Sequence, residues 1–259
     1  IYTLSLHDAL PISTTPSDWG SMGTNASYSY QLSALGANYI HYQAYDYAGN
    51  VTTGKFGPFT LSDIAAPSTP TLTHEPTYVN GSWSKEIITI SASGSTDNFT
   101  ASDALVYSVS LDGVNYAAGN TKTLSVDGNH TVYFKVTDTS GNSTVTSSVV
   151  KLDFSAPTKP SLNLIANGST YTPATWTKYS VQGTLSGSSD TGGSLLKEYQ
   201  YKIDDGNWTV GSTFTLSDTG TYTVSYRSID FAGNLSETGT ALVKVDKTLP
   251  EAFEIVAIS

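Results

Sequence analysis

Asp230-Phe231-Ala232-Gly233-Asn234 is the last of three copies of the motif Asp-x-x-Gly-Asn, which also occupies residues 46–50 and 138–142. Successive copies are 92 residues apart. Self-similarity at a fixed period is typical of repeat proteins, in which each copy folds as one unit and follows its neighbour in an array. The motif therefore indicates that this chain is a segment of a tandem array.

A strand-like run precedes each copy of the motif. The runs, at residues 38–45, 130–137 and 222–229, are rich in β-branched and aromatic residues, which favour β-strands. Within the motif, the Asp carboxylate can accept hydrogen bonds from the turn, Gly supplies a positive φ, and Asn tolerates a strained backbone. We predict a hairpin turn between the last two strands of each unit, formed by Asp46, Gly49, Asn50, Asp138, Gly141, Asn142, Asp230, Gly233 and Asn234.

Residues 157–247 have the pattern of one complete unit. Short alternating runs separated by turn residues predict seven strands, one of them over residues 178–185. Asp205-Gly206 lies between two apolar runs, which is a strong hairpin signal. Because no segment has a sustained helical spacing of apolar residues, we expect an all-β fold.

The composition excludes several classes of function. The chain has a net charge of −10, and Arg227 is its only arginine. Nucleic-acid binding needs cationic side chains to neutralise phosphates, so we predict no nucleic-acid partner. No apolar run approaches the roughly 18 residues that span a bilayer, so no membrane insertion is predicted for this segment. The absence of cysteine rules out disulfides and cysteine-bound metals.

Several features together resemble the bacterial Ig-like repeats of large secreted and surface-anchored proteins. They are the Asp-Gly hairpins, the Asp-x-x-Gly-Asn turns and the closing segment Val243-Lys-Val-Asp-Lys-Thr-Leu-Pro250, and the resemblance covers residues 14–259. It implies tandem Ig-like (fibronectin III-like) seven-stranded β-sandwiches. It also implies an extracellular location, on a bacterial cell surface or in a secreted protein. The implied partners are neighbouring repeats of the same chain, and host or cell-wall glycans or proteins.

The repeat divides the chain into five parts. Residues 1–13 look like a translated sequencing adapter, so we interpret them as an assembly artefact and exclude them from the fold. Residues 14–65 match the C-terminal half of a repeat, 66–156 and 157–247 are whole repeats, and 248–259 begin a further one. Both ends of the sequence are therefore expected to be cut.

The segment Leu216–Tyr222 resembles the tyrosine corner of Ig-type sandwiches, in which a tyrosine hydroxyl bonds back to the preceding turn. The other two copies depart from this pattern, because His130 and Asn38 occupy the position of Tyr222. We therefore expect that the corner is dispensable in the array.

Aspartates at one pole of each sandwich are candidate calcium ligands. In an Ig-like sandwich the incoming linker, the loop after the second strand and the last hairpin loop meet at that pole. This would form one group of aspartates in each of two repeats. In the first of these repeats the group is Asp63, Asp138 and either Asp97 or Asp103. In the next repeat it is Asp153, Asp190 and Asp230. Three carboxylates with loop carbonyls suit Ca²⁺, a hard ion that binds six to eight oxygens. The interpretation that we favour from the sequence is that these residues cap and form turns on an acidic surface, with no cofactor, and calcium binding is the alternative.

Other sites find less support in the sequence. Trp83, Trp176 and Trp208 could stack on sugar rings, but their recurrence at repeat positions favours a core role. No ordering of nucleophile, base and acid, and no phosphate loop, is found, so we predict no enzymatic activity. The predicted function is a non-catalytic structural spacer or adhesin arm of a bacterial surface or secreted protein. The alternatives are a glycan- or protein-binding module, or an accessory region of a secreted glycoside hydrolase.

Overall fold

A computed structural model describes residues 3–6, 35–45 and 48–253 of the chain. These residues form strands β1 to β20 and contain no helix, so the described part has no helix long and apolar enough to cross a membrane. The chain divides into two compact units. The first comprises Ile1–Thr69, Ser95–Val106 and Val136–Thr144, and the second comprises Pro70–Gly94, Tyr107–Lys135 and Val145–Ser259.

The first unit contains a three-stranded antiparallel sheet. Its order is β1 (Thr3–Leu6), β2 (Gly36–Tyr45) and β3 (Val51–Leu61). The strand β1 lies within the segment that we interpreted as foreign, and it pairs with β2 from Thr3↔Tyr45 to Leu6↔Tyr42. The hairpin between β2 and β3 closes at the first motif, where Gly49 has φ +85° and Asp46 lies outside the described residues.

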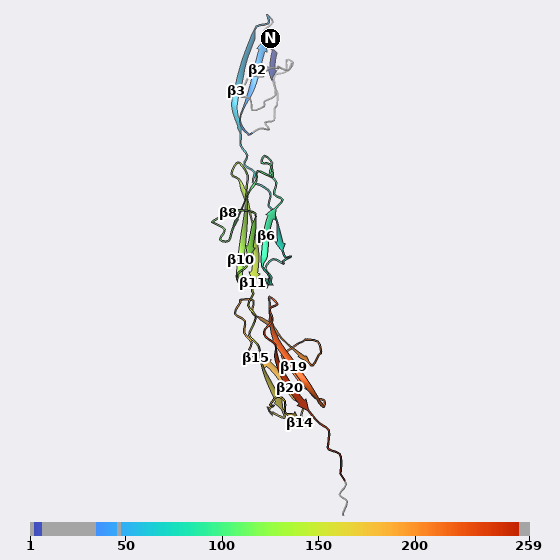
Figure 1. The fold of residues 1–259 in the computed structure, drawn as a ribbon. Helices are drawn as coiled ribbons and strands as arrows, with labels where there is room; N and C mark the ends of the chain where they lie inside the picture. Colours follow the sequence, from blue (N-terminus) through green and yellow to red (C-terminus); the bar gives the residue numbers. More distant parts are fainter. Residues whose placement is uncertain (1–2, 7–34, 46–47, 254–259) are drawn as a thin grey trace, which may run out of the picture. The chain divides into compact units, whose positions relative to one another are not determined.

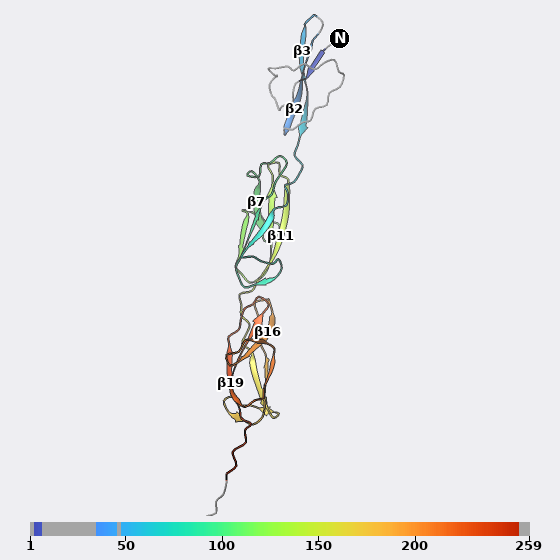
Figure 2. The ribbon, with the colours of Figure 1, turned by 90° about the vertical axis from the view of Figure 1, so that its right-hand side faces the viewer.

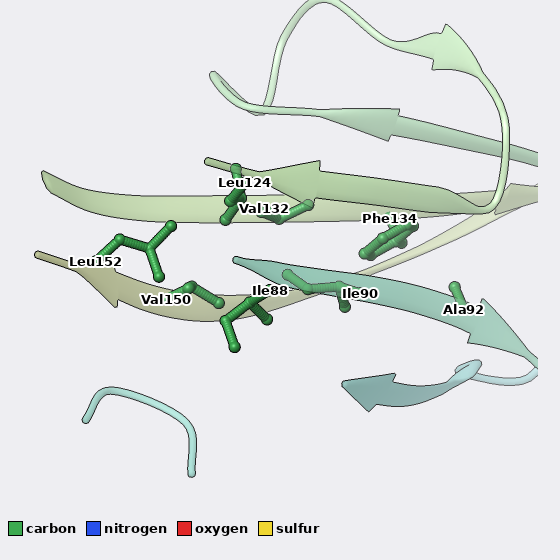
Figure 3. Packing of buried hydrophobic residues seen from close by; sticks show 8 residues of the cluster. All are labelled: Ile88, Ile90, Ala92, Leu124, Val132, Phe134, Val150 and Leu152. Carbon is green, nitrogen blue, oxygen red and sulfur yellow. The ribbon is translucent and has the colours of Figure 1, made fainter. Parts of the chain in front are cut away.

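One sandwich, most of whose residues belong to the second unit, has a three-stranded and a five-stranded sheet (Figure 1). The smaller sheet has the order β4 (Thr71–Glu75), β6 (Ile88–Ser93) and β9 (Thr121–Leu124). The larger sheet has the order β5 (Trp83–Ser84), β11 (Ser143–Leu152), β10 (Gly128–Thr137), β7 (Val106–Ser110) and β8 (Ala117–Ala118). Figure 3 shows the core between the sheets, built from Ile88, Ile90, Ala92, Leu124, Val132, Phe134, Val150 and Leu152.

The other sandwich lies within the second unit and has a four-stranded and a five-stranded sheet. Figure 2 shows β16 and β19 of its larger sheet. One sheet has the order β13 (Ser169–Thr170), β12 (Ser161–Ala166), β15 (Val181–Ser186) and β18 (Thr213–Leu216). The other has the order β14 (Trp176–Thr177), β20 (Gly239–Val245), β19 (Gly220–Asp230), β16 (Leu196–Ile203) and β17 (Thr209–Val210).

Each of these sandwiches has its own apolar core. In the second one, Val224, Val243 and Val245 are fully buried against residues of the facing sheet, such as Phe214. Burying a valine side chain contributes about 1.5–3 kcal/mol, so these short alternating strands supply a core without disulfides. Gly183 is required by this packing, because a Cβ there would lie 2.1 Å from the Phe214 ring. The predicted all-β fold of tandem Ig-like sandwiches is confirmed. The predicted number of seven strands for residues 157–247 is too low, because the two-residue strands β13 and β14 bring the number to nine, β12 to β20.

One predicted strand begins later than expected. We predicted a strand over residues 178–185, but β15 begins at Val181. The reason is that Trp176 and Thr177 pair with β20 in the opposite sheet as β14, so the chain crosses between the sheets at residues 178–180.

The prediction that the recurring tryptophans belong to the core is wrong. Trp176 is 60% exposed, and Trp83 and Trp208 are half-buried. Trp83 and Trp176 lie in the short edge strands β5 and β14, which pair in parallel with β11 and β20. An edge strand has solvent on one side, and a lysine ammonium group lies 5.9 Å from the centroid of the Trp83 ring and 5.7 Å from that of Trp176.

The corner at the start of β19 has a counterpart in the preceding repeat. The Tyr222 hydroxyl donates to the carbonyl oxygen of Asp218 at 3.0 Å. At the same repeat position, His130 Nε2 lies 2.8 Å from the carbonyl oxygen of Val126. The histidine therefore preserves the bond that we expected this copy to lack, because its ring nitrogen reaches the same backbone acceptor.

Candidate metal centre

Two groups of three aspartates lie at the places where a linker meets the loops of a sandwich. In the first unit these are Asp63 after β3, Asp97 in the loop between β6 and β7, and Asp138 after β10. One carboxylate oxygen from each lies within 4.8 Å of the other two. Asp103, the alternative to Asp97, is exposed farther along the same loop and is not in the cluster.

The second unit contains the equivalent cluster. Asp153 follows β11, Asp190 lies in the loop between β15 and β16, and Asp230 is the last residue of β19. Their carboxylate oxygens also lie within 4.8 Å of one another. Asp153 and Asp230 are fully buried and Asp190 is half-buried.

The Asp-x-x-Gly-Asn turn fixes the position of one carboxylate in each cluster. Oδ1 of Asp138 accepts hydrogen bonds from the backbone N–H groups of Ser140 at 2.9 Å and Asn142 at 2.8 Å. Gly141 has φ +94°, which disfavours any side chain with a Cβ. Asp230 accepts the equivalent 2.8 Å bond from the backbone N–H of Asn234.

The last residue of the motif has a second role, which the sequence analysis missed. Asn142 Nδ2 donates to Asp138 Oδ2 at 2.8 Å and to the backbone carbonyl of Asp63 at 3.2 Å. In the next repeat, Asn234 Nδ2 donates to Asp230 Oδ2 and to the carbonyl of Asp153, both at 2.8 Å. The amide thus ties the incoming linker to the hairpin. The available signal was that the asparagine recurs in all three copies, although local turn chemistry alone does not demand an amide there.

A glycine also shapes the second cluster and was missed. A Cβ on Gly192 would lie 1.8 Å from Oδ1 of Asp153, so no side chain fits between this loop and the linker. The neighbouring backbone N–H of Ser194 donates to Oδ2 of Asp153 at 2.9 Å. The Gly192-Gly193 pair in a loop rich in serine was the sequence signal for this close approach.

The hydrogen bonds to Asp138 come from neutral donors. Burial by itself raises the pKa of the Asp138 carboxyl, but the hydrogen bonds from Asn142, Ser140 and Gly141 outweigh it and hold this pKa below its usual value. The group is therefore an anion at neutral pH. Asp63 is only 8% exposed, and its Oδ2 has no hydrogen-bond partner among the described residues. Buried carboxylate oxygens favour a compensating cation, and an oxygen-only ligand set suits calcium or magnesium.

The aromatic candidates for sugar binding have cations on their rings. The Arg227 guanidinium carbon lies 3.9 Å from the centroid of the Trp208 ring, and the Lys135 ammonium lies 4.3 Å from that of Tyr116. Trp208 and Tyr116 occupy the same repeat position. An aromatic face that is already stacked by a cation is less available to a sugar ring.

The fold of the two sandwiches defines their structural class, which is that of tandem fibronectin III-like β-sandwich modules. No family model matches the chain. The chain is 32% identical over 218 residues to Exoglucanase B of Cellulomonas fimi, and the match covers 80% of this chain. It spans only 20% of the length of that relative.

Similar solved structures have low sequence identity. The fibronectin(III)-like modules of Clostridium thermocellum CbhA are 12% identical, with a TM-score of 0.41, covering 72% of this chain and all of that chain. A structure of a 1.5-MDa bacterial ice-binding adhesin is 15% identical, with a TM-score of 0.39, covering 95% of this chain and 86% of that chain.

Proposed function

We propose that this chain is a non-catalytic segment that spaces other modules within a secreted or surface-attached bacterial protein. The observation that carries the proposal is the position of Asp153, which is bonded to the sandwiches on both of its sides. Its backbone N–H donates to the carbonyl of Ser84 at 2.9 Å, and its own carbonyl accepts from Asn234 at 2.8 Å. A buried linker residue that is hydrogen-bonded to the sandwich on either side resists bending of the joint, which suits a spacer.

The relative supports one version of this role. Its name describes an enzyme that acts on a glucan, and this chain matches a fifth of its length. An accessory region beside a catalytic domain is therefore the version that the similarity favours. The adhesin-arm version rests on the resemblance of the repeat, and recovery of the complete open reading frame would decide between the two.

Small-angle X-ray scattering tests the spacer proposal. We would compare the chain with Asn234→Ala, which removes the tie to Asp153, and with Asn163→Ala, an exposed asparagine on β12. We expect the profile of Asn163→Ala to superimpose on that of the parent chain, and the profile of Asn234→Ala to show greater flexibility. Three profiles of equal flexibility would reject the proposal.

We further propose that each aspartate cluster binds a calcium ion. The unpartnered, buried Oδ2 of Asp63 within a group of three carboxylates is the observation that favours it. Asp63, Asp97 and Asp138 would hold one ion, and Asp153, Asp190 and Asp230 the other. The ion would supply the positive charge that the neutral donors do not, and would join linker and loops electrostatically.

Isothermal titration calorimetry of the chelator-treated chain with CaCl₂ tests this second proposal. We expect Asp138→Asn to lose one site, while Asp103→Asn, in the same loop as Asp97 but outside the cluster, keeps both. The absence of calcium binding to the parent chain would reject the metal and leave the spacer proposal intact.

A further inference from the structure

The edge around Trp83 contacts the loops of the sandwich that follows it in the second unit. A Cβ on Gly193 would lie 3.3 Å from Cη2 of Trp83, so the ring lies against this glycine. Two residues farther along, Lys85 Nζ donates to the carbonyl of Gly233 at 2.9 Å. Asp153 completes the contact through the bonds described above. These three residues, Trp83, Lys85 and Asp153, are called the joint face below.

The last sandwich carries the same three residues at its own far edge. Trp176, Lys178 and Asp246 follow Trp83, Lys85 and Asp153 by 93 residues each. Their setting within the sandwich is also the same. The Asp246 N–H donates to the carbonyl of Thr177 at 2.9 Å, and the Lys244 ammonium lies 5.7 Å from the centroid of the Trp176 ring. The equivalent distance from Lys151 to Trp83 is 5.9 Å.

The joint face and the equivalent residues Trp176, Lys178 and Asp246 differ in how far other residues cover them. Trp176 is 60% exposed, whereas Trp83 is half-buried. The Lys178 ammonium lies 5.4 Å from the centroid of its neighbour Tyr179, and the Asp246 carboxylate accepts a 2.9 Å bond from the N–H of Thr248. Since the local setting of both tryptophans is alike, the contact with Gly193 accounts for the lower exposure of Trp83.

We infer that Trp176, Lys178 and Asp246 form a docking face for another repeat of this kind, which binds through the pole that holds its glycine pair and its Asp-x-x-Gly-Asn turn. The ring of Trp176 lies on the glycine that corresponds to Gly193. Lys178 binds the carbonyl that corresponds to that of Gly233. Asp246 enters the carboxylate cluster in the place of Asp153. This inference rests on the proposed spacer function and assigns the residues of its joints.

The docking face formed by Trp176, Lys178 and Asp246 should accept a repeat with a glycine pair in its loop and exclude a repeat with larger residues there. In the middle repeat the positions of Gly192 and Gly193 are taken by Phe99 and Thr100. A Cβ at Gly192 would overlap the linker carboxylate, and a Cβ at Gly193 would press on the tryptophan ring. A repeat with a glycine pair therefore fits a face that carries tryptophan, and a repeat with Phe-Thr does not.

Hydroxyl-radical footprinting, read by mass spectrometry at each tryptophan, tests the contact in the chain as it stands. We expect faster modification of Trp176 than of Trp83. Gly193→Thr should raise the rate at Trp83 to that of Trp176. Gly168→Thr is the matched control, because Gly168 also has a positive φ, +76°, but a Cβ there meets no atom within 4 Å. An unchanged rate at Trp208 verifies that each variant is folded.

The docking itself is tested by lengthening the chain with a copy of residues 158–247 placed after Pro250. We expect the rate at Trp176 to fall to that of Trp83. The same copy carrying Gly192→Phe and Gly193→Thr should leave Trp176 reactive. A Trp176 that stays reactive in both lengthened chains overturns the docking face, while scattering that still depends on Asn234 would leave the spacer proposal standing.

Discussion

The side-chain amide of Asn234 donates a 2.8 Å hydrogen bond to the backbone carbonyl of Asp153, which lies 81 residues earlier in the chain. The same amide also bonds the Asp230 carboxylate. One side chain therefore joins the linker to the last hairpin of the sandwich. Asn142 makes the same two bonds to Asp63 and Asp138, so the arrangement recurs with the repeat.

Removal of this amide is expected to weaken the sandwich locally. In Asn234→Ala, the buried carbonyl of Asp153 and Oδ2 of Asp230 lose a donor, which costs about 1–3 kcal/mol for each unsatisfied group. Hydrogen-exchange mass spectrometry of peptides from β19 and β20 would measure the loss. Asn163→Ala, at an exposed position of β12, should leave hydrogen exchange in these peptides unchanged. Equal exchange in the two variants would contradict a structural role for Asn234.

Gly192 is expected to tolerate no side chain. Gly192→Ala would place its Cβ 1.8 Å from Oδ1 of Asp153, so the loop or the linker must move. Overpacking of this kind costs about 1–3 kcal/mol. Differential scanning calorimetry should show a lower melting temperature for Gly192→Ala and little change for Thr191→Ala, the exposed neighbour. A melting temperature equal to that of the parent chain would show that the loop relaxes freely.

Asp138 is expected to make stability depend on acid pH. The pKa of its carboxyl is lowered in the folded chain relative to its ordinary value of 3.8. The group therefore contributes stability above the unfolded pKa, and this contribution is lost as the pH falls through the lower folded pKa. Urea unfolding midpoints between about pH 2 and pH 6 should fall with acid in the parent chain and fall less in Asp138→Asn. Parallel curves would contradict the assignment.

We expect that tyrosine can replace histidine at the repeat position shared by Tyr222 and His130. Tyr222 and His130 bond the same backbone position of their repeats, at 3.0 and 2.8 Å. Tyr222→Phe and His130→Phe should each destabilise by about 0.5–1.5 kcal/mol, because each loses one hydrogen bond. His130→Tyr should retain most of the stability, since the hydroxyl can reach the Val126 carbonyl. Denaturant unfolding would rank the variants, and an equal loss in His130→Tyr and His130→Phe would refute the equivalence.

The sequence predicted those features that depend on local chemistry. Turn residues located the Asp205-Gly206 hairpin and the motif glycines, because a positive φ or a tight turn leaves a local signature. The grouping of Asp153 with Asp190 and Asp230 followed from the topology of a sandwich, which brings the linker and these loops to one pole.

Other features depend on contacts between distant segments and could not be predicted. The choice of Asp97 over Asp103 depends on the path of a single loop. The exposure of Trp176 depends on a two-residue edge strand, and the need for Gly192 depends on a carboxylate 39 positions earlier in the sequence. Repetition at a fixed interval marks such residues as structurally important, but it does not distinguish a core position from a joint.

The most direct test is the distance across the Asp153 joint, measured by double electron–electron resonance. The chain has no cysteine, so Val114→Cys and Val210→Cys, at positions that are 78% and 62% exposed, carry the only spin labels. We predict one narrow distance distribution in this doubly labelled chain, and a clearly broader one when Asn234→Ala is added. A broad distribution before Asn234 is changed would contradict the claim that buried hydrogen bonds hold the linker.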